Sequence, residues 1–246
     1  MRYKITIEYD GTNLVGWQKQ KDGPSVQEFL EKAVIGFSHE ETEIFGAGRT
    51  DAGVHALGQV AHFDLKADLS EYKLQESLNA LLRELQAPVS VWLTKKVNDD
   101  FHARFKAIGR GYIYRILNRR GDSPLRKNRI WQVTYPLDVE KMQKGATYLL
   151  GNHDFSSFRG AGCQALSPIK TLDKLDITQS GDEIIFTVEA RSFIYHQVRN
   201  MVGTLMQVGR GDLNAEDVKR ILEAKDRTKA GISAPACGLY LNKVMY

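Results

Sequence analysis

The sequence predicts an α+β fold made of two split-βαβ halves. Apolar residues that alternate with polar ones indicate strands, and apolar residues spaced by three or four positions indicate helices, in the order β-α-β-β-α-β. This order occurs in residues 1–105 and again in residues 106–246, without obvious sequence identity between the halves. We expect the two halves to join into one extended antiparallel sheet with helices mainly on one face, which leaves a long groove for a partner.

In the first half, strands are predicted at residues 3–9, 43–45, 59–65 and 89–97. The segment Pro24-Ser25-Val26-Gln27-Glu28 has a capping-box pattern and opens a helix. A second helix carries Leu74, Leu78, Leu81 and Leu82 on one face. Glycines between residues 46 and 53 predict a turn.

In the second half, strands are predicted at residues 112–117, 172–177, 184–190 and 239–244. Helices are predicted at residues 139–150 and 215–222. Another helix follows Phe193, with one apolar face that we expect to pack on the sheet. That face consists of Ile194, Val198, Met201, Val202 and Leu205. Each half is thus ferredoxin-like or RRM-like in its order of elements.

The composition is that of a globular protein, with 42% hydrophobic and 26% charged residues among 246. The first ten residues alternate in polarity and lack the continuous apolar stretch of a signal peptide or a membrane span. We therefore expect a cytoplasmic protein without membrane contact. Cys163 and Cys237 form no CxxC pair, so we expect two reduced thiols rather than a zinc or redox site.

The positive charge of the chain is concentrated in one segment. The net charge is only +4, but nine Lys and Arg side chains lie between residues 104 and 129, in a region that is also rich in aromatic residues. Such a segment suits binding to phosphates, with rings that stack on bases. A solvated basic face with no partner is the alternative interpretation.

The most unusual segment is the glycine-rich loop from Gly46 to Ala56, which contains Arg49 and Asp51. It is neither a dinucleotide-binding motif nor a phosphate-binding loop, because Asp51 stands where the third glycine would be needed and no Gly-Lys-Ser/Thr occurs. A carboxylate beside a guanidinium stays ionised, which suits a nucleophile or a base. The alternative is a turn in which Asp51 caps the backbone.

Segments along the whole chain resemble the TruA-type tRNA pseudouridine synthases. The loop Gly48-Arg49-Thr50-Asp51-Ala52-Gly53-Val54-His55-Ala56 resembles the signature loop of that family. Further matching segments are Tyr9-Asp10-Gly11, Gly16-Trp17-Gln18, Phe101-His102-Ala103-Arg104-Phe105, Val198-Arg199-Asn200-Met201-Val202-Gly203, Ala224-Lys225-Asp226-Arg227-Thr228 and Gly238-Leu239-Tyr240-Leu241.

The resemblance implies an isomerase that converts uridine to pseudouridine at positions 38, 39 and 40 of the tRNA anticodon stem-loop, after flipping the base out of its stack. It also implies a homodimer with tRNA spanning both subunits, and it implies no cofactor and no catalytic metal. The first half would carry the catalytic aspartate loop, and the second half would complete the RNA-binding cleft.

The resemblance also implies roles for five residues. Asp51 would be the catalytic aspartate, and Arg49 the arginine linked to base extrusion. Tyr112 would stack on the target base, Arg199 would pair with the aspartate, and Leu239 would form the floor of the pocket. Gly111 departs from the family, which commonly has an arginine there, and this departure puts one phosphate contact in doubt.

Several alternatives remain open at this point. The six histidines form no metal set, and His196 is either a structural residue or an RNA contact.

A non-catalytic RNA-binding protein with two RRM-like halves would need aromatic RNP signatures, which the predicted third strands lack. A hydrolase with an Asp51 nucleophile would normally need Mg²⁺ and further carboxylates. Trp17 and Trp92 are predicted to belong to the core rather than to a binding platform.

Overall fold

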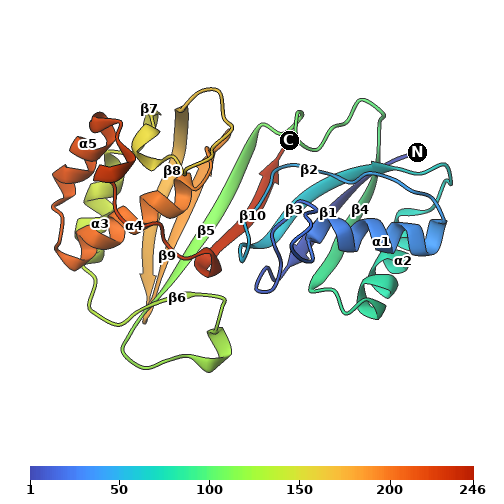
Figure 1. The fold of residues 1–246 in the computed structure, drawn as a ribbon, viewed down its shortest axis with the longest axis horizontal. Helices are drawn as coiled ribbons and strands as arrows, with labels where there is room; N and C mark the ends of the chain where they lie inside the picture. Colours follow the sequence, from blue (N-terminus) through green and yellow to red (C-terminus); the bar gives the residue numbers. More distant parts are fainter. The chain divides into compact units, whose positions relative to one another are not determined.

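The computed structural model describes residues 1–246 and divides the chain into two compact units. Unit 1 consists of Met1–Ile108 together with Tyr240–Tyr246, and unit 2 is Gly109–Leu239 (Figure 1). The division expected from sequence, 1–105 and 106–246, placed the last strand in the second half. It belongs to unit 1 because Tyr240 and Leu241 pair with His55 and Ala56.

Unit 1 contains a mixed sheet in the order β4-β1-β3-β10, with β2 paired to β3. Its elements are β1 (Arg2–Tyr9), α1 (Val26–Ser38), β2 (Phe45–Gly46), β3 (His55–Asp64), α2 (Glu71–Glu84), β4 (Val89–Val97) and β10 (Leu239–Met245). The strands β1, β2, β3 and β4 pair antiparallel, whereas β10 runs parallel to β3. The α+β class is confirmed, but the sheet is mixed rather than purely antiparallel.

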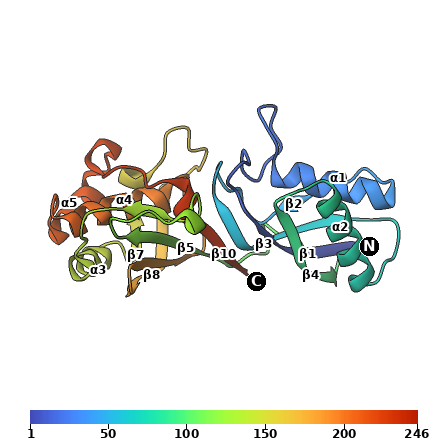
Figure 2. The ribbon, with the colours of Figure 1, turned by 90° about the horizontal axis from the view of Figure 1, so that it is seen from below.

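The core of unit 1 follows from the alternation along β1. Its apolar side chains Tyr3, Ile5, Ile7 and Tyr9 are all buried. The helices α1 and α2 pack side by side over one face of the sheet (Figures 1 and 2). Ser25 and Ser70 cap these helices, because their hydroxyl oxygens accept hydrogen bonds from the backbone N–H groups three residues later. The capping signal predicted at Ser25 is therefore confirmed.

Unit 2 contains a sheet in which β5, β9, β8 and β7 are neighbours and pair antiparallel, with β6 parallel to β5. Its strands are β5 (Gly109–Asn118), β6 (Trp131–Val133), β7 (Gly151–Asp154), β8 (Ile169–Ser180) and β9 (Glu183–Ala190). Its helices are α3 (Val139–Thr147), α4 (Gln197–Arg210) and α5 (Ala215–Ala224), with the 3₁₀ turns η1 (Pro124–Arg126), η2 (Ser156–Phe158), η3 (Arg227–Lys229) and η4 (Ala236–Gly238).

The core of unit 2 lies between this sheet and its helices. Along β9 every second side chain is buried, namely Ile184, Phe186, Val188 and Ala190. The helices α3, α4 and α5 gather against one another (Figure 1), and α3 packs on β8. The helix predicted after Phe193 begins only at Gln197, because His196 has a φ of 62° and cannot continue a right-handed helix.

None of the helices combines the length and the apolar character that crossing a bilayer requires. The longest helices, α2 and α4, have 14 residues each, whereas a helix that spans the hydrocarbon core needs about 20.

Candidate functional site

Asp51 lies in a loop of unit 1 that joins β2 to β3 and is tied to its surroundings by backbone contacts. The N–H of Trp17 donates to the carbonyl oxygen of Thr50 at 3.1 Å, and the N–H of Gly53 donates to Leu14 at 3.3 Å. On the other side, the Nε2 amide of Gln59 donates to the carbonyl oxygen of Gly48 at 2.9 Å. The loop is therefore held at its beginning, middle and end.

Two glycines let the segment after β1 lie directly against this loop. A Cβ atom on Gly11 would stand 2.1 Å from the carbonyl oxygen of Val54, and one on Gly16 would stand 2.3 Å from that of Thr50. Gly16 also has a φ of 105°, a region that side chains rarely allow. These contacts give a physical reason for the glycines in Tyr9-Asp10-Gly11 and Gly16-Trp17-Gln18.

The loop exposes its charged side chains to different degrees. Arg49 is exposed, Asp51 is half-buried, and Thr50 between them is buried. The hydroxyl of Thr50 lies 2.9 Å from the phenolic oxygen of Tyr9. The carbonyl oxygen of Asp51 accepts from the N–H of Val54 at 3.1 Å, which closes a tight turn. Buried Thr50 thus anchors the loop, and the neighbouring Asp51 remains partly exposed.

His55, at the end of the signature loop, packs in the interior of unit 1. Its ring is buried and stacks on Tyr240 with 4.7 Å between ring centroids. Its Nδ1 accepts a hydrogen bond from the N–H of Gly11 at 3.0 Å. Asp10 Oδ1 lies 3.2 Å from the same nitrogen. Because Nδ1 accepts the hydrogen bond from Gly11, it carries no proton that it could donate to the Asp10 carboxylate. The contact between His55 and Asp10 is therefore not an ion pair.

Tyr112, Arg199 and Leu239 belong to unit 2. Tyr112 lies on β5 opposite Val188, is half-buried, and packs edge-on against Phe193 with ring centroids 5.2 Å apart. Leu239 is the first residue of β10 and is 6% exposed.

Arg199 is anchored in the first turn of α4. Its Nε donates to the carbonyl oxygen of Ala234 at 2.7 Å, and the N–H of Ala234 donates back to the carbonyl oxygen of Arg199 at 3.0 Å. Its Nη1 lies 3.2 Å from Nε2 of His196. Sequence reasoning did not find Ala234, since its contribution is a backbone carbonyl that leaves no signal in the residue type.

Residues 231–234 lie directly against α4, which brings the backbone of Ala234 within hydrogen-bonding distance of the Arg199 side chain. A Cβ on Gly203 would stand 1.7 Å from the carbonyl oxygen of Ile232, so only glycine permits this approach. The N–H of Gly231 donates to the Thr204 hydroxyl at 2.9 Å. Arg227 donates to Gly231 at 3.0 Å and to Asn200 at 3.2 Å. These contacts connect the segments around Arg199 and Arg227 that sequence analysis singled out.

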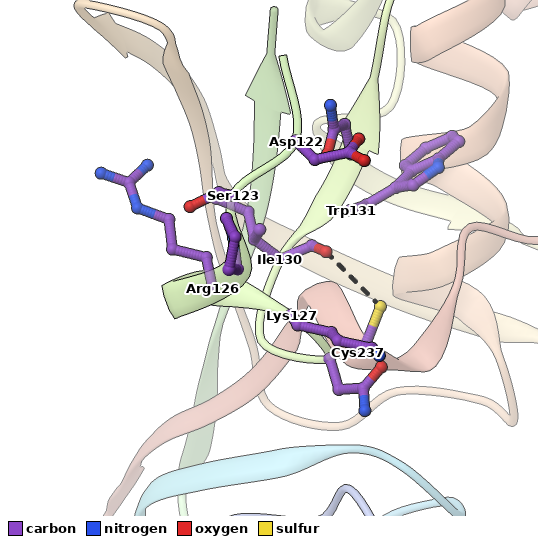
Figure 3. Close-up of a pocket in the computed structure, with 10 residues that line it drawn as sticks. Asp122, Ser123, Arg126, Lys127, Ile130, Trp131 and Cys237 are labelled. Atoms are coloured by element: carbon purple, nitrogen blue, oxygen red, sulfur yellow. Dashed lines mark hydrogen bonds between the residues drawn. The ribbon is translucent and has the colours of Figure 1, made fainter. Parts of the chain in front are cut away.

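A pocket of about 520 Å³ in unit 2 is lined mainly by the loop between β5 and β6 (Figure 3). Its lining includes Trp131, Lys127, Ile130 and Cys237. The Cys237 thiol donates to the carbonyl oxygen of Ile130 at 3.6 Å, and burial raises the pKa of this thiol. None of the five predicted site residues lines this pocket, but Arg126 and Lys127 of the basic segment that the sequence singled out do.

The structure contains no group of three or more His, Cys, Asp or Glu side chains arranged to hold a metal ion. The Asp51 loop, for example, offers one carboxylate and no second one among residues 46–56. Of the residues that the sequence singles out, Arg49 and Asp51 lie in unit 1, and Tyr112, Arg199 and Leu239 lie in unit 2.

Comparison with known proteins gives consistent matches over almost the whole chain. The family model for tRNA pseudouridine synthase matches residues 5–106 and 146–246. The tRNA pseudouridine synthase A of Paramagnetospirillum magneticum is 53% identical over 245 residues, which cover 100% of this chain and 95% of that protein. The corresponding protein of Azorhizobium caulinodans is also 53% identical, with 100% and 94% covered. That of Rhodospirillum centenum is 51% identical, with 100% and 99% covered.

Among solved structures, one titled "Crystal Structure of a Cbf5-Nop10-Gar1 Complex" matches with a TM-score of 0.37 and 12% identity, over 83% of this chain and 44% of that chain. That likeness is too weak to support a conclusion. The family model and the full-length relatives are sufficient without it. The chain belongs to the tRNA pseudouridine synthase family and is an isomerase that forms pseudouridine in tRNA.

Proposed function

We propose that this enzyme converts uridine to pseudouridine at positions 38, 39 and 40 of the tRNA anticodon stem-loop, with Asp51 as its catalytic carboxylate. The observation that carries this proposal is the fixed loop around Asp51. Hydrogen bonds from Trp17 and Gln59 and the close approach of Gly16 hold the loop, while Asp51 itself stays partly exposed. A catalytic group must be held in position, and this loop meets that requirement.

The chemistry requires little beyond a positioned carboxylate. The bond between N1 of uracil and C1′ of ribose breaks, the detached base turns, and C5 joins C1′. C5 loses its hydrogen to solvent and N1 gains one, so nothing is oxidised or reduced. Asp51 begins the reaction by attack on C1′, by attack on C6, or by removal of the C2′ proton. All three routes start from an ionised carboxylate.

The target base must leave its stack before any side chain reaches the sugar or the ring edge. We propose that exposed Arg49 fills the space that the base vacates. Tyr112 would stack on the extruded uracil, at about 1 to 3 kcal/mol for one ring on one base. Leu239 would provide an apolar floor. The guanidinium of Arg199 would bind the substrate and favour negative charge near the reacting base.

The family resemblance also supports a cytoplasmic homodimer whose two subunits together bind one tRNA. Sedimentation equilibrium tests this part of the proposal. The chain has a mass of 27.8 kDa, and a stable species of that mass at working concentrations would contradict the dimer. A species of twice that mass supports it.

Tritium release tests the catalytic assignment. Purified protein is incubated with an unmodified tRNA transcript that carries tritium at uridine C5, without added metal or nucleotide. We expect release by the wild type, none by Asp51→Asn, and wild-type release by Asp99→Asn, which makes the same chemical change at an exposed position. All three proteins should bind tRNA.

Substantial turnover by Asp51→Asn would refute the role of Asp51. The absence of release by the wild type, with intact tRNA binding, would instead favour a protein that binds RNA without modifying it. Mapping the modified positions by reverse transcription after carbodiimide treatment tests the assignment to positions 38, 39 and 40. Modification confined to another stem would refute that assignment.

A further inference from the structure

We propose that His196 is a positioning residue for pseudouridine formation, because its imidazole holds the guanidinium of Arg199 in the orientation that binds the substrate. The inference rests on the proposed substrate-binding role of Arg199. Both residues belong to unit 2, and the Nη1 atom of Arg199 lies 3.2 Å from Nε2 of His196. The sequence left His196 undecided between a structural role and an RNA contact.

The contact defines the protonation state of the histidine. A guanidinium has five N–H donors and no acceptor, so Nε2 of His196 must accept the hydrogen bond. His196 is therefore neutral, with its proton on Nδ1, whenever this contact exists. An imidazolium would direct an N–H at another N–H and would bring two positive charges together. The pair thus requires the acceptor that a neutral imidazole provides.

The contact at Nη1 adds a constraint that the other anchor cannot provide. Nε of Arg199 donates to the carbonyl oxygen of Ala234 at 2.7 Å. A bond at Nε constrains the tilt of the planar group less than bonds at two of its nitrogens do. The contact to His196 holds a second point of the guanidinium plane, at Nη1. Because its N–H groups form a rigid fork, a fixed plane also fixes the directions of its remaining donors.

The fold holds His196 in a backbone conformation that side chains seldom adopt. Its φ is 62° and its ψ is 5°, in the left-handed region, which is uncommon for residues other than glycine, although histidine adopts it more often than most. Its carbonyl oxygen accepts the N–H of Asn200 at 2.9 Å, so this residue caps α4. Such a conformation at a functional site is a reason to ask what the side chain contributes.

The ring of His196 is also held by packing. It stacks on Tyr195 with 3.8 Å between ring centroids and an angle of 24°. Gly160 lies against both residues, and a Cβ there would stand 3.0 Å from Cβ of His196 and 2.8 Å from Cδ1 of Tyr195. The N–H of Gly160 donates to the carbonyl oxygen of Tyr195 at 2.8 Å. This packing orients Nε2, but packing alone would also explain a histidine with no part in the reaction.

A matched pair of substitutions separates the two explanations. His196→Gln can place an amide oxygen near the position of Nε2, so it retains an acceptor for Arg199. His196→Met has a similar length and flexibility but no comparable acceptor. Neither side chain is β-branched, so the left-handed backbone should strain both similarly. A difference between them therefore reports the hydrogen bond rather than the packing.

We expect His196→Met to lower kcat/KM for tritium release about tenfold or more, because a misplaced group costs rate steeply. His196→Gln should restore most of that loss, while the thermal midpoints of the two variants agree. In an Arg199→Ala background, His196→Met should cause little further loss, since the two residues act as one unit. Equal losses in both single variants, an unaffected His196→Met, or fully additive losses would each overturn the inference.

These outcomes are distinct from a failure of the proposed function. If the wild type releases no tritium, the catalytic proposal fails before the histidine is tested. If the wild type is active and Arg199→Ala retains full activity, the role of Arg199 fails, and the positioning role of His196 fails with it. An active wild type and a strong Arg199→Ala effect, with no difference between His196→Met and His196→Gln, refute the positioning role alone.

Discussion

The phenolic oxygen of Tyr9 lies 2.9 Å from the hydroxyl of Thr50 in the interior of unit 1. Thr50 directly precedes Asp51, the proposed catalytic residue. The contact joins the last residue of β1 to the loop that follows β2. Either oxygen can be the donor, and both are buried, so the contact satisfies polar groups that water does not reach. The position of the Asp51 loop is thus linked to a strand of the central sheet.

Tyr9→Phe should lower both stability and turnover, because it leaves the buried Thr50 hydroxyl without this partner. We expect a loss of about 1 kcal/mol in the free energy of unfolding and a lower kcat, with tRNA affinity little changed. Tyr3→Phe is the matched control. Tyr3 also lies on β1 and donates to Leu69 at 2.9 Å, away from the loop. The Tyr3→Phe variant should lose stability but keep its kcat. Equal effects on kcat in both variants would contradict the link between Tyr9 and the Asp51 loop.

Gly16→Ala should destabilise unit 1 severely. Its Cβ would stand 2.3 Å from the carbonyl oxygen of Thr50, and its φ of 105° disfavours any side chain. We expect a loss of at least about 2 kcal/mol in urea denaturation. Gly48→Ala is the control, because a Cβ there has no neighbour within 4 Å. If both variants unfold at the wild-type midpoint, the close approach described here is wrong.

Tyr112→Phe should retain part of the activity, because the ring that stacks on uracil remains. Tyr112→Ala should lose about 1 to 3 kcal/mol of stacking, which corresponds to a fall in kcat/KM of roughly 5- to 150-fold. Tritium release under single-turnover conditions measures both variants. A complete loss in Tyr112→Phe would show instead that the phenolic hydroxyl takes part in the reaction.

His62 makes the stability of unit 1 depend on pH. Burial, and then the neighbouring charge of His102, lower the pKa of His62 from 6.5 to about 4. Its Nδ1 accepts the N–H of Ala103 at 3.2 Å, which requires a neutral ring. His62 therefore binds a proton more readily in the unfolded chain than in the folded one. The contribution of neutral His62 to the free energy of unfolding is fully present above pH 6.5 and is lost as the pH falls towards 4.

Replacement of this histidine should reduce the acid sensitivity. Between pH 6.5 and 4, the wild type should lose on the order of 2 to 3 kcal/mol more than His62→Gln, since one pKa unit is worth about 1.4 kcal/mol. Urea midpoints measured at several pH values give the difference between the two proteins, in which the carboxylates common to both cancel. Parallel curves for the two proteins would rule out His62 as the source.

Local signals allowed the sequence to predict most of the secondary structure. The strand predicted at residues 89–97 is β4 with the same bounds, and the capping pattern at Ser25 opens α1. The short strands β6 and β7 have three and four residues, too few for a recognisable period. The strand predicted from Gln59 begins at His55, in part because its first residues pair with β10 from the far end of the chain.

The site was predicted through its motifs rather than through its contacts. Asp51, Arg49 and the glycines around them stand out in the sequence, whereas the partners of Arg199 do not. One partner is the carbonyl oxygen of Ala234, a group that every residue has. A further partner is His196, whose contact depends on a left-handed cap at the start of α4. Such contacts depend on packing and backbone conformation, which periodicity and composition do not reveal.

The pairing of β10 with β3 has a consequence for synthesis on the ribosome. The strand that completes unit 1 beside His55 is made only after all of unit 2. At about 10 residues per second, the earlier strands of unit 1 wait on the order of 10 s for this partner. During that time the edge of β3 is open to pairing with other chains. A chaperone that binds nascent strands would protect this stage.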